Sequence, residues 1–90
     1  MDILCDEGRF YLGGDKTRPV SEVNFERVGD RLLVVVHTFT VPGKRNQGIA
    51  RKLVERVAQY AREGGYKVKA TCPYAKKVLS EEVFADVFIE

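Results

Sequence analysis

Hydrophobic and polar residues recur along the chain with two different periods, and these periods predict both strands and helices. Leu32 to Phe39 is dense in β-branched and aromatic residues, which is typical of a buried strand. From Ile49 to Ala61, apolar residues recur every three or four positions and mostly polar and charged residues fill the opposite face, so this segment should form an amphipathic helix with one buried stripe. Gly64-Gly65 should end the helix, because glycine readily adopts the left-handed conformation that closes one.

Shorter alternating segments lie on both sides of this helix. Arg9 to Gly13 and Ser21 to Val28 each place apolar side chains on one face, and Gly29-Asp30 should connect the second segment to the next strand through a short hairpin. After the helix, Tyr66 to Cys72 alternates in the same way. Pro73 to Leu79 should form a short helix, because proline is favoured at the first helical position. The pattern therefore predicts an antiparallel meander, one long helix, a further strand and a short helix.

The junction between the long strand and the long helix carries the most informative motif, Arg45-Asn46-Gln47-Gly48-Ile49-Ala50. The first turn of a helix leaves backbone N–H groups without partners, and Gly48 has no side chain to keep a ligand away from them. Such a turn binds anions, and pyrophosphate is the ligand that we expect there.

The charge distribution supports an anionic ligand at this turn. Residues 43–79 contain ten lysines and arginines and two glutamates, a net charge of +8, whereas the rest of the chain has a net charge of −6. Most of these cations should simply form a solvated helix face and a solvated strand face. Lys44, Arg45, Arg51 and Lys52 lie nearest the turn, and they are the candidates for contacts with phosphate groups.

Composition is that of a compact folded domain. The 90 residues are 44% hydrophobic, which suits one domain spanning residues 1–90 and excludes a disordered chain. The longest apolar run is Leu32 to Val36, and the chain begins with Met-Asp, so we expect no membrane span, no signal peptide and a cytoplasmic location. Cys5 and Cys72 lack metal-ligand spacing, so we expect no metal site and two reduced thiols.

Together with its flanks, the turn from Arg45 to Ala50 resembles the acetyl-CoA motif of the Gcn5-related N-acetyltransferase (GNAT) superfamily. The signature is Gln/Arg-x-x-Gly-x-Gly/Ala, in which Arg45 matches the first position, Gly48 the central glycine and Ala50 the final small residue. His37-Thr38-x-x-Val41 before the turn and Cys72-Pro73-Tyr74 after the helix are similar to the very short, single-motif members of this superfamily. The resemblance covers most of the chain.

The resemblance implies an α+β fold of one domain, a truncated GNAT-like fold with an antiparallel meander sheet, a splayed parallel strand pair, one long helix and one or two short C-terminal helices. The pantetheine arm of acetyl-CoA or coenzyme A would lie in the splay. Full-size members build much of the acceptor site from terminal segments for which this chain has no room. The candidate cofactor-binding residues are Val41, Lys44, Arg45, Asn46, Gln47, Gly48, Ile49, Ala50, Arg51 and Tyr74.

Cys72 is the first candidate for a catalytic residue. It precedes Pro73, at or beside the N-cap of the short helix, where the helix N-terminus and the cations Lys76 and Lys77 favour a thiolate. The resemblance implies that its thiol faces the thioester, either as a transient acyl acceptor or as a group that handles the proton of the leaving sulfur. The alternative is a small buried apolar residue, which is the usual state of a free cysteine.

His37 is the second candidate. The alternation places it on the same strand face as Leu33, Val35 and Phe39, which favours a histidine satisfied within the sheet or the core. The alternative is a general base that takes a proton from the acceptor amine, since imidazole titrates near neutral pH. Thr38 should point to the other face of the strand.

The resemblance implies transfer of acetyl from acetyl-CoA to an amine, either a small amine or a lysine side chain. The alternative is a non-catalytic module that binds or senses acyl-CoA. Nucleic acid is a less suitable partner, because the basic segment lacks a recognised binding motif or a platform of aromatic side chains. Exposed edge strands would allow a weak homodimer as well as a monomer.

Overall fold

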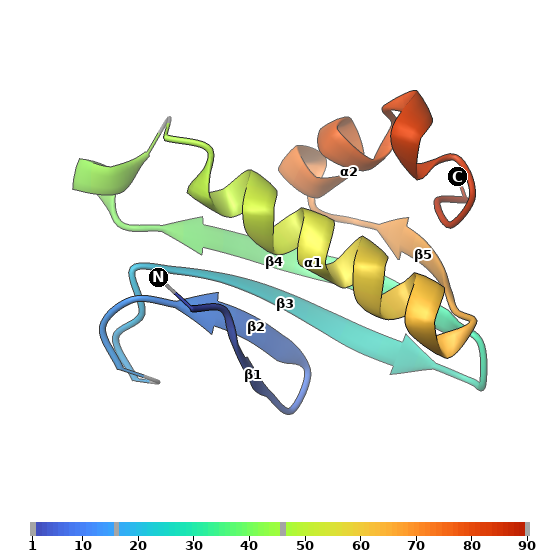
Figure 1. The fold of residues 1–90 in the computed structure, drawn as a ribbon, viewed down its shortest axis with the longest axis horizontal. Helices are drawn as coiled ribbons and strands as arrows, with labels where there is room; N and C mark the ends of the chain where they lie inside the picture. The colour runs from blue at the N-terminus through green and yellow to red at the C-terminus, as the bar shows by residue number, and fades with distance from the viewer. Residues whose placement is uncertain (1, 16, 46, 90) are drawn as a thin grey trace.

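The computed structural model describes residues 2–15, 17–45 and 47–89, which fold into a five-stranded sheet with helices packed on it (Figure 1). The elements are β1 (Leu4–Asp6), β2 (Arg9–Leu12), β3 (Ser21–Val28), β4 (Leu32–Thr40), the 3₁₀ turn η1 (Pro42–Lys44), α1 (Ile49–Gly64), β5 (Lys67–Ala70), α2 (Pro73–Leu79) and the 3₁₀ turn η2 (Glu82–Phe84). β1 to β4 form an antiparallel meander, and β5 runs parallel to β4. This architecture confirms the predicted fold class.

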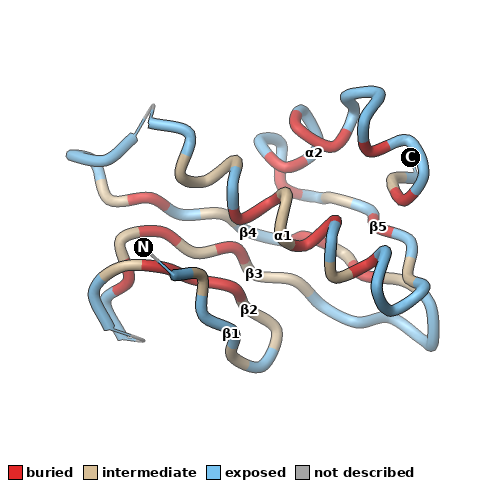
Figure 2. Tube along the Cα trace, viewed as in Figure 1, coloured by how far each residue is buried: buried red, intermediate tan, exposed pale blue. Residues whose placement is uncertain are grey.

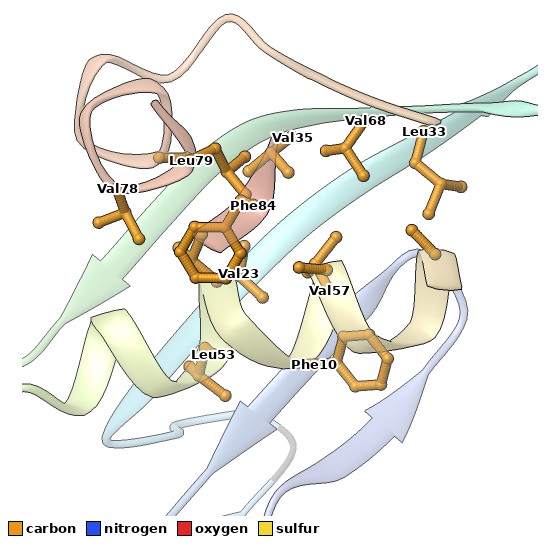
Figure 3. Packing of buried hydrophobic residues seen from close by; sticks show 14 of the residues in the cluster. Phe10, Val23, Leu33, Val35, Leu53, Val57, Val68, Val78, Leu79 and Phe84 are labelled. Atoms are coloured by element: carbon orange, nitrogen blue, oxygen red, sulfur yellow. The ribbon is translucent and has the colours of Figure 1, made fainter. Parts of the chain in front are cut away.

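Both α-helices cover the same face of the sheet, and the core lies between them and the strands. Val23 and Val35 of the sheet are fully buried in one cluster with Leu53 and Val57 of α1, and Leu79 of α2 belongs to the same cluster (Figure 3). Buried positions recur along α1 with helical spacing (Figure 2). α1 therefore lies across the sheet. This packing fixes the position of the helix N-terminus relative to the end of β4.

The long helix begins and ends where the hydrophobic pattern predicts. Gly48 is the N-cap of α1 with φ of 74°, and Gly65 is the C-cap with φ of 75°, so both glycines are left-handed. At the C-terminal end, the N–H of Tyr66 donates to the carbonyl of Ala61 at 2.8 Å. None of the helices in the described part of the chain has the length and apolar character needed to cross a membrane.

A β-bulge interrupts the pairing of β3 with β4. Val35 lies opposite Phe25 and His37 lies opposite Asn24, so β4 has one extra residue, Val36, between two consecutive positions of β3. Such an insertion shifts the alternation of side chains by one residue. Odd-numbered and even-numbered residues of β4 therefore exchange faces of the sheet after the bulge.

The bulge overturns the predicted orientation of two neighbouring side chains. Leu33 and Val35 face α1, as expected, but after the bulge it is Thr38 that continues this face, because Thr38 lies opposite the core residue Val23. His37 is exposed and points away from α1. The prediction that His37 shares a face with Leu33 and Val35 is wrong, and so is the opposite placement of Thr38, since simple alternation assumes an uninterrupted ladder.

The sequence pattern does not predict β1. Its residues pair with β2, with Cys5 opposite Phe10, and both Leu4 and Cys5 are exposed. A strand this short with exposed side chains carries no alternation of buried and polar positions. β1 therefore depends on the edge that β2 offers for pairing.

Candidate functional site

The parallel strands β4 and β5 separate before β4 ends. Their pairing stops at Val35 and Ala70, and the N–H groups of Thr71 and Cys72 both donate to the carbonyl of Val35, at 2.9 and 3.3 Å. β4 then continues through residues 36–40, whereas the other chain segment turns into α2. The β5 side of this last part of β4 has no strand partner among the described residues, and we call it the free edge of β4.

A cleft of about 470 Å³ lies along the free edge of β4. Seven of the predicted site residues line it, namely His37, Lys44, Arg45, Gly48, Ile49, Ala50 and Tyr74. The other lining residues are Thr38, Phe39 and Thr40, which are not among the predicted site residues. The one sequence feature that could have pointed to them is the His37-Thr38 motif, which contains Thr38. Of the remaining predictions, Val41, Gln47, Arg51 and Cys72 do not line the cleft, and Asn46 lies outside the described residues.

The N-terminus of α1 opens into this cleft. The first helical hydrogen bond runs from the N–H of Lys52 to the carbonyl of Gly48 at 3.1 Å, so the preceding N–H groups have no partner within the helix. No side chain of the described residues caps this end, and the first turn carries no acidic residue. A Cβ atom at Gly48 would meet no protein atom within 4 Å. Backbone conformation therefore requires glycine here, and the space in front of it is open to a ligand.

Two cations stand beside this helix N-terminus. Lys44 ends the η1 turn, and Arg45 follows it directly. The Nε of Arg45 donates to the carbonyl of Thr40 at 3.1 Å, which holds the guanidinium at the end of β4. Together with the helix dipole, these side chains give this end of the cleft a positive potential that suits phosphate groups.

Two other predicted ligands already have partners within the protein. Both terminal nitrogens of Arg51 donate to the carboxylate of Glu81, at 2.6 and 2.7 Å, and this ion pair raises the pKa of Arg51 and lowers that of Glu81. The N–H of Val41 donates to the carbonyl of Val20, and its own carbonyl accepts from the N–H of Lys44, both at 2.9 Å. Arg51 therefore joins α1 to the residue that precedes η2, and Val41 anchors the η1 turn.

Cys72 is the N-cap of α2, as predicted, and the residue is only 8% exposed. Its Sγ lies 3.5 Å from the hydroxyl of Thr38, which lines the cleft. Burial raises the pKa of the Cys72 thiol, but hydrogen bonds from the Thr38 hydroxyl and from the backbone of Ala75 and Tyr74 outweigh burial and lower it below its ordinary value. The thiol is therefore a better acid than a free cysteine, and Thr38 connects it to the cleft.

The cleft lies at the edge of the sheet, where residues that point to either face meet. Thr38 and Thr40 present their side chains on the α1 face, whereas His37 and Phe39 present theirs on the opposite face, and all four line the same cleft. This is possible because the missing β5 partner leaves an opening at the free edge of β4. Residues that point to either face of the sheet therefore border this one cleft.

A splayed parallel strand pair with a helix N-terminus at its open end defines this domain as one with an N-acetyltransferase fold. Comparison with known families agrees. The family model described as GCN5-related N-acetyl-transferase matches residues 9–87, and the chain belongs to that family. The comparison with curated proteins gives no match.

Solved structures show the same relationship. The solution NMR structure of a GCN5-like protein from Staphylococcus aureus is 30% identical, with a TM-score of 0.84 over 98% of this chain and 87% of that chain. The ribosomal-protein-alanine N-acetyltransferase of Brucella melitensis biovar Abortus 2308 is 25% identical, with a TM-score of 0.61 over 82% of this chain and 62% of that one. Nourseothricin acetyltransferase is 27% identical, with a TM-score of 0.55 over 67% of this chain and 36% of its own.

Proposed function

We propose that this protein transfers an acetyl group from acetyl-CoA to an amine. One observation carries the proposal: a single cleft follows the free edge of β4 from the N-terminus of α1 to Thr38, which contacts Cys72. The pyrophosphate would bind at the N-terminus of α1, beside Lys44 and Arg45. The pantetheine arm would follow the free edge of β4 and use its backbone groups as an added strand does.

The residues around the α1 N-terminus suit such an anionic acetyl donor. The space in front of Gly48 is open. The first turn of α1 contains no acidic residue, and no side chain of the described residues caps its N–H groups. Lys44 and Arg45 add positive charge at the same end of the cleft. A site built for a cation would have the opposite electrostatics.

Transfer requires a neutral amine beside the thioester carbonyl, and N–H groups of the free edge would polarise that carbonyl as charge grows on its oxygen. The nitrogen–carbon bond forms and the carbon–sulfur bond breaks; the nitrogen loses a proton to solvent and the sulfur of coenzyme A gains one. Cys72, with its lowered pKa, would supply the proton of the sulfur through the Thr38 hydroxyl and recover one from solvent.

Turnover is the test of this proposal. The protein would be incubated with acetyl-CoA and a panel of small amines, polyamines and lysine peptides, and acetylated product would be measured by mass spectrometry. Coenzyme A binding would be measured separately by calorimetry. Binding with product formation supports the proposal. Binding without product from any amine supports a non-catalytic module that binds or senses acyl-CoA, and absence of binding contradicts both functions.

Alkylation tests the placement of Cys72. In a Cys5→Ser variant, Cys72 is the remaining thiol, and coenzyme A should slow its reaction with iodoacetamide because the pantetheine arm covers Thr38. An unchanged rate at saturating coenzyme A would place the arm elsewhere. Acetylated Cys72, detected after incubation with acetyl-CoA alone, would instead support a covalent acyl intermediate.

A further inference from the structure

The face of the sheet that points away from α1 carries an ordered set of side chains beside the cleft. The strand register places Tyr11, Glu22 and Phe39 in one row across β2, β3 and β4. The next row contains Asn24 and His37, and Arg9 of β2 lies opposite Asn24 in the same row. Both α-helices pack on the other face, so no helix of the described residues covers these rows. We call Tyr11, Glu22, Phe39, Asn24 and His37 the outer patch.

Glu22 is the acidic group of the outer patch, and its charge is only loosely paired. Its side chain is 21% exposed, and its carboxylate lies 3.7 Å from Arg9, too far for a hydrogen bond. Arg9 instead donates to Asp6 at 3.2 Å and stacks on the ring of Tyr11 at 4.2 Å. The carboxylate of Glu22 therefore keeps hydrogen-bonding capacity for a further cation.

The outer patch also provides a base and an aromatic surface beside this carboxylate. Phe39 lies directly opposite Glu22 and is 37% exposed, so its ring is available to a cation. His37 is two residues from Phe39 on β4 and is the diagonal neighbour of Glu22, at a Cβ separation of roughly 7 Å for such pairs. Both His37 and Phe39 line the cleft. A short molecule can therefore touch Glu22 and reach the opening at His37 at once.

We propose that the outer patch is the acceptor-binding site and that it selects a primary amine carrying a second cationic group on a short alkyl chain. This inference rests on the proposed acetyl transfer. The second ammonium binds between the Glu22 carboxylate and the Phe39 ring. The reacting ammonium gives one proton to His37, and the neutral amine attacks the thioester through the opening at the free edge of β4. His37 then releases that proton to solvent.

Glu22→Gln tests the selection, with Glu26→Gln as the matched control. Glu26 lies on the same strand and the same face but opposite Val34, before the bulge and away from the opening. With spermidine as the acceptor, Glu22→Gln should raise KM about tenfold, because a charge-assisted contact is lost. With butylamine, which has no second cation, KM should stay within twofold. Glu26→Gln should change neither value.

Two further measurements separate this inference from the proposed function. The calorimetric affinity for coenzyme A and the melting temperature should be unchanged in Glu22→Gln, which excludes damage to the donor site or the fold. Amide shifts on adding spermidine to the coenzyme A complex should centre on Glu22, Asn24 and His37, and this readout needs no turnover. Shifts there without acetylation contradict the proposed function alone. If acetylation occurs but Glu22→Gln changes the KM equally for spermidine and butylamine, or changes neither, the outer patch is not the acceptor-binding site.

Discussion

Replacing Gly48 by alanine separates two requirements for glycine at this position: the left-handed backbone conformation and the open space in front of the backbone. Gly48 has φ of 74°, a conformation that strains any residue with a Cβ atom. The added methyl group would meet no protein atom within 4 Å, so strain is the whole cost in the free protein. In the complex with coenzyme A, the same methyl group would occupy the space that we assign to a phosphate.

The magnitudes of the two effects differ. A non-glycine residue in the left-handed region costs about 1 to 2 kcal/mol, which for a domain of this size corresponds to a fall in melting temperature of roughly 4 to 16 °C. Loss of one charge-assisted hydrogen bond between phosphate and the helix N-terminus costs about 1.5 to 3 kcal/mol of binding free energy. That loss raises the Kd for coenzyme A by roughly tenfold to a hundredfold.

Gly65→Ala is the matched control for this measurement. Gly65 caps the other end of α1 with φ of 75°, and a Cβ atom there also meets nothing within 4 Å. Melting temperatures measured by circular dichroism without ligand should fall by similar amounts in Gly48→Ala and Gly65→Ala. Calorimetry below both melting temperatures should show weaker coenzyme A binding in Gly48→Ala only.

Equal affinities of Gly48→Ala and Gly65→Ala for coenzyme A would refute this reasoning, because they would mean that the ligand does not approach the backbone of Gly48. A much larger loss of stability in Gly48→Ala than in Gly65→Ala would contradict the structural basis of the comparison, since both positions have the same φ and the same open surroundings.

Three further predictions concern the pKa of Cys72, the ion pair of Arg51 with Glu81 and the hydrophobic core. Thr38→Val should raise the pKa of Cys72, because a hydroxyl donor is lost, and an unchanged pH profile of alkylation would contradict this. Arg51 lowers the pKa of Glu81 below its ordinary value of 4.5, so the pair stabilises the fold above that value and loses its effect as pH falls through the lowered pKa. Urea midpoints of Glu81→Gln should thus lie below those of the wild type at pH 7 and coincide with them in strong acid. Leu53→Ala should cost about 2 to 5 kcal/mol in urea unfolding, and a loss below 1 kcal/mol would show that the core refills the cavity.

Elements with a local cause were predictable from the sequence. The apolar stripe of α1 is visible in the chain because its period is a property of the helix itself. Its C-terminal end follows from Gly65, and the start of α2 from Pro73, since both residues act through their own backbone conformation. The position of Cys72 at the N-cap of α2 follows from Pro73 in the same way.

Part of the cleft was predictable for the same reason. Lys44, Arg45, Gly48 and Ala50 are close in sequence to the N-terminus of α1, and all of them line the cleft. The motif that predicts them is contiguous, so one helix end is enough to bring them together. Arg51 belongs to the same segment, but its guanidinium binds Glu81, thirty residues later in the chain, which no local pattern reveals.

The sequence by itself determined the order of strands and helices from β2 to α2, the ends of α1 and the glycine turn at its N-terminus, because these features depend on neighbouring residues. Only the tertiary structure decided that His37 and Thr38 lie on the faces opposite to those predicted. Alternation along a strand gives a relative phase, and the extra residue Val36 becomes visible only against its partner strand β3. That one residue turns Thr38 toward Cys72 and His37 toward the open face, so Thr38 and His37 line one cleft but point to opposite faces of the sheet.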